Sequence, residues 1–291
     1  MRVGIFGKSF SEEFDEPIKL LIQELTNNGV EILVYHRFAN FLKDRVTLNG
    51  DMKGFASASV SDLDLLISIG GDGSLLDTIS VVRGTGVPIL GVNTGRLGFL
   101  SNVSIDTITE SVVALVEKKY TIDNRELIQV SSQDEDFRGW GYALNEATLH
   151  KKDSSSMITV KTWVNDTFMN AYWADGLIVS TPTGSTAYSL SCGGPIVMPG
   201  SRNFIFTPIA PHNLNVRPMV IPSNNNVVKL KAEGREPNHL LTLDSRSFTI
   251  SADTVLEIKS ADFEISLVNL PGQHFFHTIR KKVNWGIDRR N

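Results

Sequence analysis

The chain has 291 residues, of which 41% are hydrophobic and 21% charged, and its net charge is −4 at pH 7. This is the composition of an ordinary globular protein, long enough for two domains and able to bury a sizeable core. The slightly acidic balance gives no attraction to nucleic acid or to a membrane surface, so we expect neither as a partner. Cys192 is the only cysteine, which excludes an intrachain disulfide and fits a reducing compartment.

The N-terminal residues carry no recognisable targeting signal. They enter a strand-like run at once and lack the apolar core and small-residue cleavage site of a signal peptide. No uncharged run in the sequence is long enough to span a bilayer. We therefore expect a cytoplasmic protein.

Strand and helix signals alternate over the first 116 residues. Short apolar runs predict four strands, over residues 3–6, 30–35, 63–69 and 87–92. Apolar residues at helical spacing predict three helices, over residues 17–25, 74–82 and 105–116. Alternation of this kind is typical of βαβ units around a parallel sheet.

The pattern changes near residue 120. From residue 127 to 268 most runs are short and extended, and turn signals separate them at residues 165–166, 224–226 and 233–234. The runs that alternate or nearly alternate predict half-buried strands, over residues 227–231, 240–243 and 255–258. The sequence therefore predicts a β-rich second domain, followed by a helix over residues 274–283.

A glycine-rich loop with a single carboxylate follows the predicted strand at 63–69. Residues 70–74 read Gly-Gly-Asp-Gly-Ser. Glycines let a ligand approach the backbone closely, and successive backbone N–H groups can cradle phosphate oxygens. A carboxylate repels phosphate, so Asp72 indicates work on a hydroxyl or a metal beside the phosphates. The alternative is a plain strand-to-helix turn in which Asp72 caps the helix.

A second glycine-bearing loop follows the predicted strand at 87–92. Residues 93–99 read Asn-Thr-Gly-Arg-Leu-Gly-Phe. In an open α/β sheet, ligands bind beyond the carboxyl ends of the strands. We therefore expect the loops at 70–74 and 93–99 to face one crevice.

Residues 175–195 form a dense hydroxyl- and glycine-rich segment around a short apolar strand at 177–179. Hydroxyls and free backbone N–H groups suit a ligand with many polar atoms, such as a nucleotide. A turn-rich connector would have a similar composition. Asn145 and Glu146 interrupt the apolar run at 142–149, where a ligand or a cross-strand hydrogen bond would have to satisfy them.

Common nucleotide and metal motifs are missing. Gly7-Lys8-Ser9 resembles the end of a P-loop, but Arg2 stands where its first glycine belongs. The dinucleotide fingerprint fails because Leu76 replaces its third glycine. The sequence has no His-Glu-x-x-His motif and no cysteine cluster, so we expect no structural zinc.

Taken together, these segments resemble the NAD kinase family, in its bacterial form. The matching segments are residues 70–73, 93–100, 145–146, 175–195, 212–218 and 279–285. A lone Gly-Gly-Asp-Gly is shared with diacylglycerol, sphingosine and phosphofructokinase relatives. The run Thr-Pro-Thr-Gly-Ser-Thr-Ala-Tyr at 181–188 is much more specific.

The resemblance implies an enzyme that transfers a phosphoryl group from ATP to the 2′-hydroxyl of the adenosine ribose of NAD, giving NADP and ADP. It implies that Asp72 is the general base, and that Mg²⁺ or Mn²⁺ is held mainly through the ATP phosphates. It also implies a Rossmann-like α/β domain over 1–120, joined by the C-terminal segment 270–291, and a β-sandwich NAD-binding domain over 121–269. A homodimer or homotetramer is the implied assembly.

The resemblance places nucleotide-binding positions in both domains. In the first domain they are Gly70, Gly71, Gly73, Ser74, Asn93 and Phe99. In the second they are Asn145, Glu146, Asp175, Thr183, Thr186, Ala187, Tyr188, Ser189, Leu190, Ser191 and Ala210.

The sequence departs from the family pattern at three places. Ser74 replaces a common Thr and keeps the hydroxyl, whereas Asp244-Ser245-Arg246 replaces a more usual Asp-Gly-Gln. Trp173 stands where many relatives carry arginine, which bears on the accepted phosphate donors and reduced cofactors.

Two other functions share part of the signature: a lipid or sphingoid kinase, which would need an acyl cleft, and a nucleotide sensor without turnover.

Overall fold

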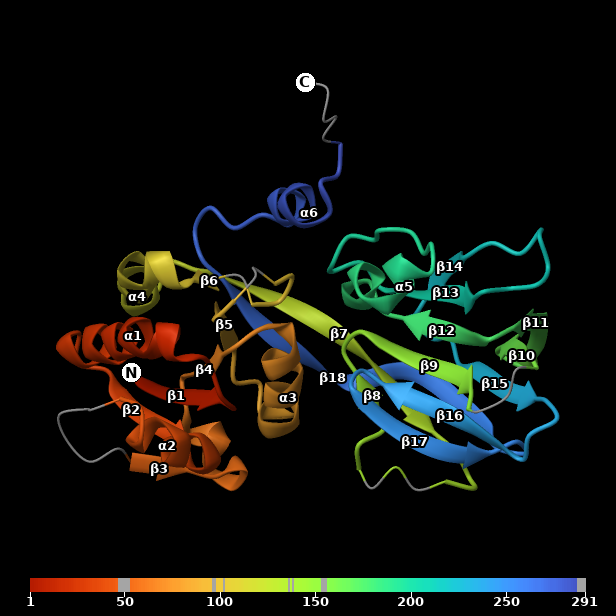
Figure 1. Cartoon of the computed structure of the whole chain (residues 1–291), viewed down its shortest axis with the longest axis horizontal. Coiled ribbons are helices and arrows are strands. Elements are labelled where there is room, and N and C mark those ends of the chain that lie inside the picture. The colour runs from red at the N-terminus through yellow and green to blue at the C-terminus, as the bar shows by residue number, and fades with distance from the viewer. Residues whose placement is uncertain are drawn as a thin grey trace. The chain divides into compact units, whose positions relative to one another are not determined.

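The computed structural model describes residues 1–46, 53–95, 98–101, 103–135, 137, 139–152 and 156–286. The chain divides into two compact units, which Figure 1 shows with the helices and strands labelled. Unit 1 consists of Met1–Asn124 and Ile265–Asn291, and unit 2 of Arg125–Glu264. None of the described helices is both long enough and apolar enough to cross a membrane.

Unit 1 is built on a parallel sheet in the order β5-β4-β1-β2-β3, with β6 and the end of β18 also pairing in parallel to β5. Its strands are β1 (Arg2–Gly7), β2 (Glu31–Tyr35), β3 (Lys53–Phe55), β4 (Leu65–Ile69), β5 (Ile89–Asn93) and β6 (Val103–Ser104). Its α-helices are α1 (Asp15–Asn27), α2 (His36–Lys43), α3 (Asp72–Val82), α4 (Ile108–Val116) and α6 (Phe275–Val283). Short 3₁₀ turns are η1 (Glu12–Phe14), η2 (Ser57–Asp62) and η3 (Ile105–Thr107).

Helices cover both faces of this sheet. The buried residues of α1, α2 and α4 join one apolar cluster with alternate residues of the strands, including Ile67 and Ile69 of β4. Ser68, between them, points to the other face and accepts a hydrogen bond from Thr78 of α3. Helix α3 therefore packs on the face opposite α1 and α4, which lie side by side in Figure 1.

The four strands predicted in this unit are confirmed as β1, β2, β4 and β5. The helices predicted at 17–25, 74–82 and 274–283 are confirmed as α1, α3 and α6. The helix predicted at 105–116 is divided into the 3₁₀ turn η3 and the α-helix α4. Helix α2 and strand β3 were not predicted.

Unit 2 contains two antiparallel sheets. One has the order β14-β13-β12-β9-β16-β17, and the other the order β11-β10-β15-β18, with β7 paired to β18 and to β8. The strands of the first are β9 (Glu146–Lys151), β12 (Gly176–Ser180), β13 (Asn203–Ile209), β14 (Met219–Pro222), β16 (Asn238–Leu243) and β17 (Arg246–Ser251). Those of the second are β7 (Thr121–Ser131), β8 (Tyr142–Ala143), β10 (Ile158–Val164), β11 (Thr167–Ala174), β15 (Val228–Glu233) and β18 (Val255–Asn269).

The two sheets of unit 2 share one core. Leu177 and Phe206 of the first sheet belong to the same buried cluster as Val160 and Leu256 of the second. Two antiparallel sheets packed face to face form a β-sandwich, as the family resemblance implied. Beyond β12, the chain forms the 3₁₀ turn η4 (Thr183–Thr186) and the one-turn helix α5 (Tyr188–Ser191).

Candidate active site

The loop after β4 begins with a glycine that the fold requires. All five residues of β4 are buried. Gly70 follows with a φ of 139°, and a Cβ atom there would lie 2.2 Å from Ser74 Oγ. Helix α3 starts at Asp72, with Gly71 as its N-cap and no side-chain cap. The alternative in which Asp72 caps the helix is therefore wrong.

Gly71 and Gly73 are not required by their own surroundings. Neither has a left-handed φ, and a Cβ atom at either would meet no atom within 4 Å. The first N–H groups of a helix have no partner inside the helix and attract anions. Two glycines beside open space at this terminus are what close approach of a phosphate group needs.

The Asp72 carboxylate is held by the second glycine-bearing loop. Its Oδ2 accepts from Phe99 N at 2.9 Å, and its Oδ1 accepts from Leu100 N at 3.0 Å and Ser101 N at 2.9 Å. Gly98 makes this approach possible, because a Cβ there would lie 1.8 Å from Oδ1. The two glycine-bearing loops thus come together at Asp72.

Asn93 fixes the base of that second loop. It ends β5, is 3% exposed, and donates from Nδ2 to the carbonyl of Ser101 at 3.2 Å. Phe99 is half-buried. Arg96 and Leu97, part of the matched segment 93–100, lie outside the described residues.

Sequence reasoning missed one residue beside Asp72. The ammonium of Lys282, on α6, lies 4.0 Å from Asp72 Oδ2 and 4.7 Å from the centre of the Phe99 ring. The closing segment 279–285 stands out in the sequence only as part of the family match, and its basic residues are assigned no role there. Nothing in local spacing reveals a contact across 210 residues.

In unit 2, the structure brings Asn145 together with the segment that follows β12. Thr181 donates from its backbone N to the carbonyl of Asn145 at 2.9 Å, and from its hydroxyl to the carbonyl of Leu144. Gly184 lies against the same backbone, because a Cβ there would be 2.1 Å from the Asn145 carbonyl oxygen. Two of the segments matched in the sequence are therefore neighbours.

The apolar pattern at 142–149 suggests one continuous strand, but the structure has two strands there. β8 ends at Ala143 and β9 begins at Glu146. Between them the carboxylate of Asp244 accepts from the backbone N–H groups of Leu144, Asn145 and Glu146. This buried carboxylate replaces strand pairing for those N–H groups, so the chain can turn there.

Glu146 is an unusual acid. It is 8% exposed, and its Oε2 makes no hydrogen bond to any described residue. Burial, and secondly the nearby Asp244, raises the pKa of Glu146 to about 8. Its carboxyl group therefore carries a proton at neutral pH and is able to donate a hydrogen bond. The cross-strand partner considered for this side chain is absent from the described residues.

Asp175 forms an ion pair in this part of unit 2. Its Oδ1 lies 2.6 Å from Lys151 Nζ, and both side chains are largely buried. Its backbone is fixed by strand pairing, since Lys151 N donates to the Asp175 carbonyl. Trp173, two residues earlier, packs against His212 with ring centroids 4.2 Å apart and the ring planes tilted by 47°.

In the hydroxyl-rich segment at 175–195, some of the predicted site residues are buried and others are exposed. Ser189 is fully buried and bonds Thr207 at 2.7 Å, and Thr183 accepts from Arg125 at 3.2 Å. Tyr188 and Ser191 are exposed. The other predicted positions here, Thr186, Ala187 and Leu190, are half-buried, and Ala210 is exposed with a left-handed φ of 44°.

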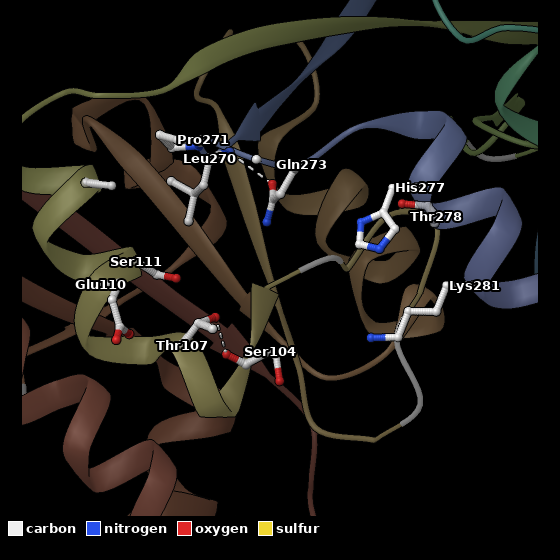
Figure 2. Close-up of a pocket in the computed structure, with 12 residues that line it drawn as sticks. Ser104, Thr107, Glu110, Ser111, Leu270, Pro271, Gln273, His277, Thr278 and Lys281 are labelled. Atoms are coloured by element: carbon white, nitrogen blue, oxygen red, sulfur yellow. Dashed lines mark hydrogen bonds between the residues drawn. The ribbon is translucent and has the colours of Figure 1, made fainter.

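A cavity lined in part by α6 lies elsewhere in unit 1. It has a volume of about 470 Å³ and contains none of the predicted site residues. Figure 2 shows His277 and Lys281 of α6 on one side and Thr107 and Glu110, from η3 and α4, on the other. Among the described residues, no group of three or more His, Cys, Asp or Glu side chains could hold a metal ion.

Two family models match most of the chain. The ATP-NAD kinase N-terminal domain matches residues 3–120, and the ATP-NAD kinase C-terminal domain matches residues 144–270. The chain belongs to the NAD kinase family. Curated NAD kinases from Flavobacterium johnsoniae and Bacteroides fragilis are 43% and 42% identical to it, over 100% of both chains in each comparison.

Solved structures agree with this assignment. An NAD kinase from Archaeoglobus fulgidus, in complex with ATP, is 25% identical, with a TM-score of 0.76 over 98% of this chain and 99% of that one. Yeast NADH kinase with NADH shares the fold at 22% identity, with a TM-score of 0.87 over 99% and 89%. As an NAD kinase, the protein is a phosphotransferase that makes NADP from NAD with ATP.

Proposed function

We propose that the protein phosphorylates the 2′-hydroxyl of the adenosine ribose of NAD, with Asp72 as the general base. The observation that carries this proposal is the setting of Asp72. Three backbone N–H groups fix its carboxylate at the N-terminus of α3, beside two glycines that face open space. A fixed carboxylate beside an anion-binding terminus suits phosphoryl transfer to a hydroxyl.

The chemistry follows from the lone pairs of that carboxylate. Among the described residues, Oδ1 accepts two hydrogen bonds, whereas Oδ2 accepts one. Each carboxylate oxygen has two lone pairs, so Oδ2 keeps room for the proton of an alcohol. In the proposed reaction Oδ2 takes this proton while the N-terminus of α3 and the backbone of Gly70, Gly71, Gly73 and Ser74 hold the donor phosphates.

We assign NAD binding to unit 2. The neutral carboxyl of Glu146 and the adjacent Asn145 offer hydrogen bonds to a ribose, and Asp175 offers an acceptor for an amine or amide. Tyr188 supplies an exposed aromatic ring. The remaining assigned positions are Asn93 and Phe99 in unit 1, and Thr183, Thr186, Ala187, Ser189, Leu190, Ser191 and Ala210 in unit 2.

The described side chains do not form a metal site of their own. We propose that Mg²⁺ or Mn²⁺ enters bound to the phosphates of ATP, where it would supply charge neutralisation. No step assigned to this chain depends on a protein ligand to that ion.

We also propose that the enzyme is a cytoplasmic homodimer or homotetramer. The edge strand β14 supports an assembly, because Met219 and Val220 on it are 46% and 42% exposed. Light scattering after size-exclusion chromatography measures the subunit count directly, and a strict monomer would contradict the proposed assembly.

The test of the function is an acceptor assay. The full chain with ATP·Mg²⁺ is given NAD, NADH or diacylglycerol, with polyphosphate as an alternative donor. Formation of NADP from NAD, and none of phosphatidic acid from diacylglycerol, supports the proposal. Saturable NAD binding without turnover under any donor or metal would contradict it and favour a nucleotide sensor.

A further inference from the structure

Lys282 is a charged residue of the last turn of α6 that the reaction scheme above does not use. Its side chain is 26% exposed, and its ammonium faces Asp72 Oδ2 at 4.0 Å. The ring of Phe99 lies 4.7 Å from the same ammonium. The contacts of Lys282 are thus with the candidate base and with the loop that holds it, all within unit 1.

The contacts with Asp72 and Phe99 orient the Lys282 ammonium without engaging its N–H donors in hydrogen bonds. A distance of 4.0 Å is too long for a hydrogen bond to Asp72, and the contact with Phe99 is made with the ring face. A lysine ammonium has three N–H donors. Lys282 is therefore positioned beside the reacting carboxylate with donors left for another group.

The carboxylate oxygen that Lys282 faces is the one with spare capacity. Oδ1 of Asp72 already accepts from Leu100 and Ser101, whereas Oδ2 accepts only from Phe99 among the described residues. An acceptor hydroxyl that gives its proton to Oδ2 would lie next to the ammonium. The γ-phosphorus that this hydroxyl attacks would lie one bond length beyond the hydroxyl oxygen, and its oxygens would then be near the Lys282 ammonium.

We propose that Lys282 is a catalytic residue that donates hydrogen bonds to the γ-phosphate of ATP during transfer; this rests on the proposed function. A bond forms between the ribose oxygen and the γ-phosphorus, and the bond from that phosphorus to the β–γ bridging oxygen breaks. ADP leaves with the electron pair, and the hydroxyl proton passes to Asp72 Oδ2. Lys282 stabilises the negative charge on the transferred oxygens.

The competing explanation is that Lys282 only fastens α6 to the loop at 98–101. A partly exposed ion pair at 4.0 Å contributes little to stability, so this role predicts a small effect of its removal. Lys281 offers a matched control on the same helix. Its side chain lines the separate cavity of Figure 2 and makes no described ion pair.

The experiment compares full-length Lys282→Met, Lys282→Arg and Lys281→Met with the wild type. We expect Lys282→Met to lower kcat/KM for ATP on the order of 100-fold, as loss of one transition-state donor does. The KM for NAD should stay within about twofold, because the hydrogen bonds assigned to Lys282 go to ATP. Lys282→Arg should recover part of the loss, and Lys281→Met should match the wild type.

A binding measurement separates charge from structure. Calorimetric titration with ATP and with ADP, in Mg²⁺ and without NAD, should show weaker ATP binding and unchanged ADP binding in Lys282→Met. A loosened helix would weaken both nucleotides alike, and that result overturns the proposal even if the variant is less stable. Wild-type kcat/KM in Lys282→Met overturns it as well. Absence of NADP formation by the wild type would instead contradict the proposed function.

Discussion

The backbone N–H of Glu146 donates to Oδ1 of Asp244 at 3.3 Å, and the charge of Asp244 also acts on the Glu146 side chain. Asp244 accepts two further hydrogen bonds there, from Leu144 and Asn145. One carboxylate therefore shapes the backbone on which Asn145 and Glu146 are presented, and its charge adds to the burial that raises the pKa of Glu146.

We predict that Asp244→Ala is strongly destabilising. The substitution leaves three backbone N–H groups without their acceptor, and the loss should be about 3 kcal/mol or more in the free energy of unfolding. Urea denaturation measures it. Asp244→Asn is the control, because an amide oxygen can still accept; equal stability of the alanine variant and the wild type would contradict the role assigned to Asp244.

Glu146 predicts a specific dependence of stability on pH. Its folded pKa of about 8 lies above the ordinary value of 4.5, so the folded state binds more protons than the unfolded state between these values. Its contribution is therefore fully present below pH 4.5 and is lost as the pH rises to 8. The change is on the order of 5 kcal/mol at most.

The comparison that tests this is Glu146→Gln against the wild type, with unfolding measured from pH 5 to 9. Relative to the wild type, the glutamine variant should gain stability steadily as the pH rises to 8. Parallel stability curves would show that Glu146 titrates normally.

Gly73→Ala should separate folding from ligand approach. A Cβ atom at this helical position meets nothing within 4 Å, so the change should stabilise the fold by about 0.5 kcal/mol through loss of backbone freedom in the unfolded chain. The same methyl group occupies space that we assign to the donor phosphates, so the KM for ATP should rise. Thermal unfolding and kinetics at varied ATP concentration measure the two effects. An unchanged KM for ATP would contradict the assignment of the space beside these glycines to the donor phosphates.

Gly98→Ala, unlike Gly73→Ala, should disturb the arrangement of the site itself. Its Cβ atom would lie 1.8 Å from Asp72 Oδ1, so the carboxylate must leave its three N–H partners. We expect kcat to fall about 100-fold or more, since a small misplacement of a reacting group has that effect. A single-turnover assay measures the step, and Gly95→Ala, whose Cβ has no contact nearer than 3.8 Å, is the control.

Elements with strong local signals were predictable from the sequence. β4 is a run of five buried residues stopped by glycine, and α1 carries one apolar face. The meeting of the loops at 70–74 and 93–99 was also predictable, because the carboxyl ends of parallel strands share one edge. Helix α2 was not, since it begins directly after β2 with no cap or break between them. β18 was seen only at residues 255–258, because polar residues interrupt its apolar pattern further on.

The parts of the site that depend on distant contacts were less accessible. Asp244 was noted in the sequence only as part of a departing motif, although its partners lie about one hundred residues away at 144–146. Lys282 reaches Asp72 from the other end of the chain. Neither contact has a local period or spacing, because each is created by the pairing of strands and the return of α6 to unit 1.

The most direct test of the central claim is the rate of NADP formation by Asp72→Asn at saturating NAD and ATP·Mg²⁺. The amide oxygen can still accept from Leu100 and Ser101, but the side chain no longer takes up a proton. We predict that kcat falls by about 10³-fold, within the range for loss of a general base, while the dissociation constant of NAD changes little. A normal turnover rate in Asp72→Asn would contradict the assignment of Asp72 as the base.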